Sequence, residues 1–147
     1  MFYRIIFSII IYGDDKIIYV FRLTNGMDLK KEIVKYCSDN DIKAGYIGAC
    51  VGCCSEINLR LAGGKEFFNK NADYEIVSMT GTISENGVHI HSSFSDDLGN
   101  VVGGHLSDGC IVNTTAEVVV SSIDNYKLVR IFDENTGYKE LDIKKVK

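Results

Sequence analysis

The chain of 147 residues contains no proline and no tryptophan. Without proline there is no proline-rich linker, and without repeats or low-complexity tracts nothing divides the chain, so one domain is expected. An excess of basic residues is also missing: acidic residues outnumber basic ones, the net charge is −4 and the isoelectric point is about 5.3. That balance argues against a protein that grips nucleic acid through a basic surface.

Long hydrophobic runs are missing as well. The most apolar stretch, residues 1–12, is interrupted by Arg4 and Ser8 and is shorter than the roughly 20 residues that a membrane helix needs. It resembles the core of a signal peptide but lacks a small-residue cleavage site. An N-terminal extension over 1–15 that forms an edge strand or a pairing arm is therefore expected, in front of a single domain over 16–147.

Cysteine occurs five times, an odd number that favours reduced thiols and a cytoplasmic location over a disulfide framework. Cys50, Cys53 and Cys54 have a spacing that fits zinc or redox chemistry. However, no second Cys-x-x-Cys occurs, and a structural zinc normally needs four ligands. The surrounding residues indicate a buried strand, so these thiols are predicted to belong to the core.

Hydrophobic periodicity predicts one helix over 28–38, capped by Asp28, and a β-hairpin turn at Asn86-Gly87. Residues 66–71 are expected to form a loop. Short connections exclude βαβ crossovers, so the fold class is α+β, a mostly antiparallel sheet of about seven strands with one main helix. The expected strands are 16–23, 43–51, 55–62, 74–84, 88–95, 110–122 and 126–132.

The three histidines of the chain all fall within 17 residues. His89 and His91 are two positions apart on an expected strand, so both rings leave the same face of the sheet. His105 follows a tight turn and Gly103-Gly104, on a segment that turns back beside that strand. Glycines there would let the backbone pass close to a ligand or another chain.

Three imidazoles with an open fourth position are the pattern of an exchangeable or catalytic metal site, with zinc as the leading ion and nickel, cobalt or iron as alternatives. The competing interpretation is that the rings only form hydrogen bonds to Ser92, Ser93 or Asp96. Side chains that could act as acid, base or anion clamp beside a metal are predicted elsewhere in the chain. They are Glu56, Arg60, Glu75 and Glu117.

Several segments together resemble a known family, and they cover most of residues 16–142. The closest are 74–81 (YEIVSMTG), His89-Ile90-His91, 95–99 (SDDLG), 101–106 (VVGGHL), Leu59-Arg60, Gly109, Val112, Thr115 and Glu117. The family that they resemble is the plants-and-prokaryotes-conserved (PPC) domain, in the stand-alone prokaryotic form without an AT-hook.

The resemblance implies an α+β fold, similar to that of acetolactate decarboxylase, a zinc enzyme with a three-histidine site. It also implies a homotrimer. The function expected from it is a metal-binding protein, with zinc as the ion, that acts on or binds a small carbonyl or carboxylate metabolite. The alternative is a DNA-binding or regulatory protein that acts as a trimer, and whether the chain is an enzyme stays open.

Overall fold

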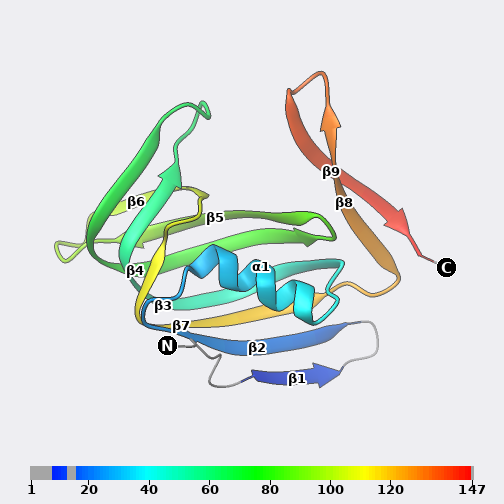
Figure 1. Cartoon of the computed structure of the whole chain (residues 1–147), viewed down its shortest axis with the longest axis horizontal. Helices are drawn as coiled ribbons and strands as arrows, with labels where there is room; N and C mark the ends of the chain where they lie inside the picture. Colours follow the sequence, from blue (N-terminus) through cyan, green and yellow to red (C-terminus); the bar gives the residue numbers. More distant parts are fainter. Residues whose placement is uncertain (1–7, 13–15, 147) are drawn as a thin grey trace.

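The computed structural model describes residues 8–12 and 16–146, which form a curved β-sheet with one helix on one face and a separate hairpin (Figure 1). The sheet has seven strands in the order β1-β2-β7-β3-β4-β5-β6, and every pair is antiparallel. The predicted fold class is therefore confirmed. The elements are β1 (Ser8–Tyr12), β2 (Ile17–Thr24), α1 (Leu29–Asp39), β3 (Ala44–Arg60), β4 (Phe67–Ser84), β5 (Gly87–Ser95), β6 (Val101–Leu106), β7 (Ile111–Ser122), β8 (Tyr126–Asp133) and β9 (Tyr138–Lys145).

Helix α1 begins where the sequence predicts it to begin. The carboxylate of Asp28 accepts a hydrogen bond from the backbone N–H of Lys31 at 3.1 Å, which satisfies one of the free donors of the first turn. Four side chains of one helix face are buried against the sheet: Leu29, Ile33, Tyr36 and Cys37. A tight turn also joins β4 and β5 as predicted, but its two residues are Glu85 and Asn86, because Ser84 pairs with Gly87 at the end of the hairpin.

The sheet curls back on itself at one end. The last residues of β3 pair with β6 as well as with β4, and Arg60 lies opposite His105. Gly104 permits this approach, because a Cβ there would lie 2.8 Å from the carbonyl oxygen of Arg60. The glycine pair thus lets the end of β3 approach β6 closely. The curl places the end of β3 beside the strands that carry the histidines.

The sequence-based assignment of secondary structure was wrong at three places. The expected strands 43–51 and 55–62 are one strand, β3, which carries register irregularities around Cys54 and Glu56. The expected loop 66–71 is the start of β4, where polar residues pair with the second half of β3. The third error is β9, which was not predicted at all. Polar strands of this kind give little apolar periodicity, because both of their faces meet water.

Strands β8 and β9 form a two-stranded hairpin over residues 126–145, called the β8–β9 arm from here on. It rises from one end of the sheet, and the tip of the β3–β4 hairpin rises in the same direction from the other end (Figure 1). At its root Leu128 is buried, and its N–H and C=O bond to Lys43 and Glu85 at 3.1 and 2.9 Å. Lys127 forms an ion pair with Glu85 at 2.5 Å.

Strand β1 lies at the edge of the sheet and pairs with β2, which agrees with the expected edge strand for this part of the extension. The rest of the expected extension, residues 1–7 and 13–15, lies outside the described residues. Within the described part of the chain, no helix combines the length and hydrophobicity needed to cross a membrane.

Candidate metal centre

Two neighbouring strands place the three histidines side by side. His89 and His91 stand on β5, and β6 pairs with β5 so that His105 lies opposite His91. One ring nitrogen from each of the three residues can be chosen so that all three lie within 4.8 Å of one another. Strand alternation and strand pairing therefore bring the three predicted ligands together.

The separations are close to those that a shared ion requires. The Nε2 atoms of His89 and His91 are 3.2 Å apart, and the three ring centroids are 4.9 to 5.6 Å apart. Zinc–nitrogen bonds of about 2.0–2.1 Å in tetrahedral geometry place ligand nitrogens about 3.3 Å from one another. The pair on β5 has this spacing, and a ring nitrogen of His105 lies within 4.8 Å of both.

The surroundings of His89 and His105 favour the neutral form of imidazole, which is the form that ligates metals. Burial lowers the pKa of His105 to about 4, and the positive charge of Arg60 adds to the effect. The pKa of His89 is also lowered, first by burial and then by Arg130. Among the described residues, nothing lies within hydrogen-bond distance of the buried Nδ1 atom of His105. A buried ring nitrogen normally has a partner, and an ion is one way to supply it.

The competing interpretation, hydrogen bonds from the histidines to Ser92, Ser93 or Asp96, is not what the described residues show. Ser93 bonds to the hydroxyl of Ser78 at 2.8 Å, and the carboxylate of Asp96 accepts bonds from Leu98 and Asn100. The buried hydroxyl of Ser92 has no partner among the described residues. The Nε2 atoms of His89 and His91 lie within hydrogen-bond distance of each other.

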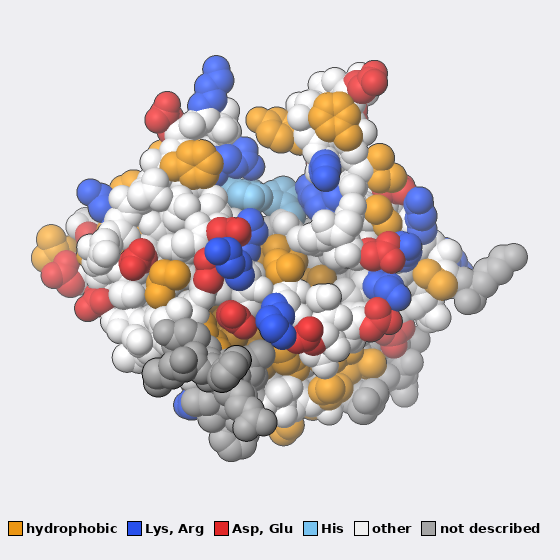
Figure 2. Space-filling model, viewed as in Figure 1, with side chains coloured by type: hydrophobic (Ala, Val, Ile, Leu, Met, Phe, Trp, Pro, Cys, Tyr) orange, Lys and Arg blue, Asp and Glu red, His pale blue; other side chains and the backbone are white. Residues whose placement is uncertain are grey.

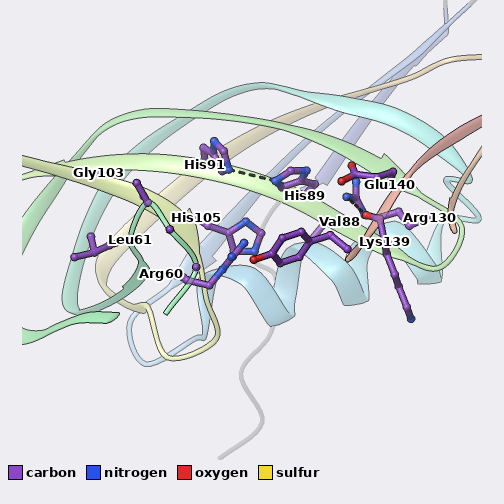
Figure 3. A pocket seen from close by; sticks show the side chains of 15 residues that line it. Arg60, Leu61, Val88, His89, His91, Gly103, His105, Arg130, Lys139 and Glu140 are labelled. Atoms are coloured by element: carbon purple, nitrogen blue, oxygen red, sulfur yellow. Dashed lines mark hydrogen bonds between the residues drawn. The ribbon is translucent and has the colours of Figure 1, made fainter. Parts of the chain in front are cut away.

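The histidines form part of the wall of a pocket of about 840 Å³. Figure 2 shows them, in pale blue, at the floor of a hollow between two raised parts of the molecule, with basic side chains on both sides. One wall is the end of β3 and the turn that follows it, residues 60–64, and the other is the β8–β9 arm. The side chains that converge on this space are drawn in Figure 3.

The pocket is rich in cations although the chain as a whole is acidic. Arg60, Arg130 and Lys139 line it, and Glu140 is the one carboxylate among its lining residues. The guanidinium of Arg60 lies 5.8 Å from the ring centroid of Tyr138, and the guanidinium of Arg130 donates to the carbonyl oxygen of Lys139 at 2.5 Å. Within the described part of the chain, none of the three cations forms an ion pair with a carboxylate.

Of the four side chains predicted to assist chemistry, Arg60 lines the pocket and the three glutamates do not. Glu56 belongs to β3 and lies opposite Asn71 of β4 and Ile111 of β7. It is away from the end of the strand where Arg60 lies. Glu75 and Glu117 are exposed on β4 and β7. The structure does not bring these carboxylates to the histidines, and any catalytic role for them stays a prediction.

The sequence reasoning missed the pocket residues of the arm: Arg130, Tyr138, Lys139 and Glu140. A turn pattern before β9 could have revealed them. Asp133 and Gly137 bracket a turn, with a hydrogen bond from the Gly137 N–H to the Asp133 carbonyl at 2.8 Å. Polar and apolar residues alternate over 140–144 (ELDIK), which is the period of a strand, although only two apolar residues mark it.

Comparison with known proteins places this architecture in a family. The family model described as the Plants and Prokaryotes Conserved (PCC) domain matches residues 11–124. The bifunctional protein GlmU of Synechococcus sp. (strain JA-3-3Ab) is 38% identical over 129 residues, which are 88% of this chain and 21% of GlmU. The chain thus spans about a fifth of the length of that curated relative.

Solved structures share the fold over nearly their whole length. A hypothetical protein from Salmonella cholerae-suis has a TM-score of 0.86 and 29% identity, covering 91% of this chain and 97% of its own. The metal-containing protein AF0104 from Archaeoglobus fulgidus has a TM-score of 0.69 and 27% identity, covering 91% and 96%. A protein from Bacteroides thetaiotaomicron with a name that suggests DNA binding has a TM-score of 0.76, covering 92% and 96%, and at 23% identity it supports the shared fold alone.

Proposed function

The chain belongs to the Plants and Prokaryotes Conserved domain family, and from that premise we propose that it binds one divalent metal ion through His89, His91 and His105. The ion proposed first is zinc, because three neutral imidazoles with room for a further ligand suit it. The bound ion would face the pocket and meet a small molecule with a carbonyl or carboxylate oxygen.

One observation carries the proposal: three imidazole nitrogens converge within 4.8 Å at the floor of a pocket. The lowered pKa values of His89 and His105 support it, because protons then compete little with a metal at neutral pH. The name of the Archaeoglobus fulgidus protein, which describes a metal-containing protein on the same fold, agrees with it.

An ion at this position would polarise a carbonyl oxygen or lower the pKa of a bound water toward about 7. The residues of the chain itself would bind and orient the ligand. Arg60 stands at the end of β3, opposite His105, where its planar guanidinium can hold a carboxylate by two hydrogen bonds. Glu140 is the pocket residue that can accept or deliver a proton.

Metal analysis of protein purified without a histidine tag tests the proposal. We expect close to one zinc ion per chain, removal by a chelator, and recovery on addition of zinc. Anomalous scattering from crystals at the zinc edge would then show the ion between the three rings. Protein that carries no stoichiometric metal and takes none up from solution would refute the proposal.

DNA binding, the alternative, stays a prediction without a specific observation in its favour. It requires duplex DNA to bind with an affinity that falls steeply as salt rises. A titration with duplex DNA at low salt measures this directly, and a flat curve would remove the alternative.

We also retain the homotrimer as a proposal. Val51, Val77 and Val101 are 62%, 54% and 59% exposed on the strands of the sheet, and a subunit interface would bury such side chains. Light scattering of the purified protein tests the assembly, and a mass equal to that of one chain would reject it.

A further inference from the structure

We propose that the β8–β9 arm selects the ligand of this pocket, by binding the carboxylate or phosphate group of a small molecule through Arg130. The inference rests on the proposed function, since the metal would hold the other end of the ligand. It adds a second binding region, which the histidines do not contribute, and a chemical class of ligand.

Charge is the first argument. The pocket contains three cationic side chains and one carboxylate, and a divalent ion on the histidines would add two further positive charges. No carboxylate of the described residues lies within ion-pair distance of Arg60, Arg130 or Lys139. Like charges gathered in a partly enclosed site repel one another unless an anion enters, so the pocket favours a negatively charged ligand.

Geometry is the second argument. Arg60 belongs to β3, whereas Arg130 belongs to the arm, and the histidines lie between the two walls (Figures 2 and 3). An oxyanion between the walls can therefore meet guanidinium donors from both sides, while the side chain of Lys139 extends away from the histidines (Figure 3). The volume of about 840 Å³ suits a small metabolite and is within the common range for such sites.

The arm is held in place by the turn that leads into the strand of the histidines. The side-chain amide of Asn86 donates to the carbonyl oxygen of Arg130 at 2.9 Å, and its oxygen accepts from the N–H of Arg130 at 2.8 Å. The Arg130 guanidinium is held in turn by the carbonyl oxygen of Lys139. A cation fixed in this way loses little conformational freedom when a ligand binds, which favours affinity.

The family model matches residues 11–124, so the histidines lie inside the match and the arm, which begins at Tyr126, lies after it. Solved structures of the same fold cover 91% and 94% of the chain, so part of the arm has a counterpart in them.

The test compares two variants of the arm by calorimetry. Arg130→Gln removes the guanidinium of the arm that lies in the pocket, and Lys144→Gln removes a cation of β9 that pairs with Asp142 at 3.5 Å and does not line the pocket. The zinc-loaded proteins are titrated with inorganic phosphate, malonate and phosphoglycolate, which present a phosphate, two carboxylates, or one of each. Zinc content and the midpoint of thermal unfolding are measured first for each protein.

We expect at least one probe to bind the original protein, and Arg130→Gln to weaken that binding by about tenfold or more, because a charged hydrogen bond is lost. Lys144→Gln should change the affinity by less than about twofold, since an exposed charge outside the site contributes little. Which probe binds best distinguishes a phosphate ligand from a carboxylate one.

Two results would overturn the inference: equal affinities in the two variants, or no binding of any probe up to about 10 mM. Failure of the metal proposal is separately visible, because zinc content is measured before the titrations. If no zinc binds, the same titrations on the metal-free protein still compare Arg130→Gln with Lys144→Gln. A loss specific to Arg130→Gln then supports anion recognition by the arm alone.

Discussion

The sheet carries two groups of side chains that can ligate metals, the histidines and the cysteines, and burial acts on them with opposite consequences. Burial lowers the pKa of His105 to about 4 and raises the pKa of the Cys50 thiol to about 12. Both shifts favour the neutral form. Neutral imidazole is the form that binds a metal, whereas a neutral thiol does not, because the thiolate is the ligand.

Position reinforces this difference. The histidines line a pocket, while Cys50, Cys54 and Cys110 are buried in the core. In the described part of the chain, the histidines are the group of possible ligands whose atoms gather closely enough for an ion. Residue type alone therefore does not identify a metal site, and the same desolvation can create one site and exclude another.

The largest expected effect is a loss of bound zinc when a histidine, but not a cysteine, is replaced. His105→Ala should weaken zinc binding by at least about 100-fold, because one of three protein ligands is lost. The fold should persist, since the buried Nδ1 atom has no hydrogen-bond partner among the described residues and removal of the ring breaks no bond there. Zinc per chain, measured by mass spectrometry after dialysis, checks this.

Cys54→Ala is the matched control for that experiment. Cys54 is fully buried, so the change should cost about 1–2 kcal/mol of the free energy of unfolding and leave zinc content unchanged. Zinc loss in Cys54→Ala equal to that in His105→Ala would contradict the distinction between the two groups.

The second effect is a loss of stability in alkali that comes from the cysteines. Burial raises the pKa of Cys37 to about 12 and that of Cys110 to about 11, from an ordinary value of 9.0. Above pH 9 the unfolded chain therefore releases thiol protons that the folded chain keeps. Each such thiol should lower the free energy of unfolding by about 1.4 kcal/mol per pH unit, up to its folded pKa.

Urea unfolding at pH 8.5 and 10 measures this slope. Cys37→Ala removes one buried thiol, so its stability should fall less steeply over the same interval, although it is less stable at pH 8.5. Identical slopes for the two proteins would show that the Cys37 thiol does not stay protonated in the fold.

The smallest expected effect is a difference in reactivity among the cysteines themselves. Cys53 is half-buried, and its sulfur lies 2.9 Å from the hydroxyl of Thr114, while the other four thiols are buried. A thiol reagent should therefore modify Cys53 rapidly in the native protein and the other four only on unfolding. Cys53→Ser should abolish the rapid phase, and rapid reaction of a further thiol would show that the core opens readily.

Local sequence predicted much of the metal centre. The alternation of a strand puts His89 and His91 on one face, and the glycines and the turn before His105 indicate that its segment folds back. Asp28 and the apolar spacing after it predicted α1, because capping and helix periodicity are properties of neighbouring residues. These features depend on short separations along the chain.

The pocket could not be predicted in the same way. Arg60 and Arg130 are 70 positions apart, and the position of the arm depends on Asn86 and Glu85 in a distant turn. The polar strand β9 gives no apolar stripe that marks it for the core. The sequence-based candidates Glu56, Glu75 and Glu117 had suitable chemistry, but alternation and pairing along their strands put them elsewhere.

The sequence by itself determined the fold class, the helix and the pair of histidines on one strand, because these follow from local periodicity and turn chemistry. Tertiary structure decided that His105 completes the group and that cations from two distant segments face the histidines. Those outcomes depend on strand pairing, which acts between residues far apart in the chain.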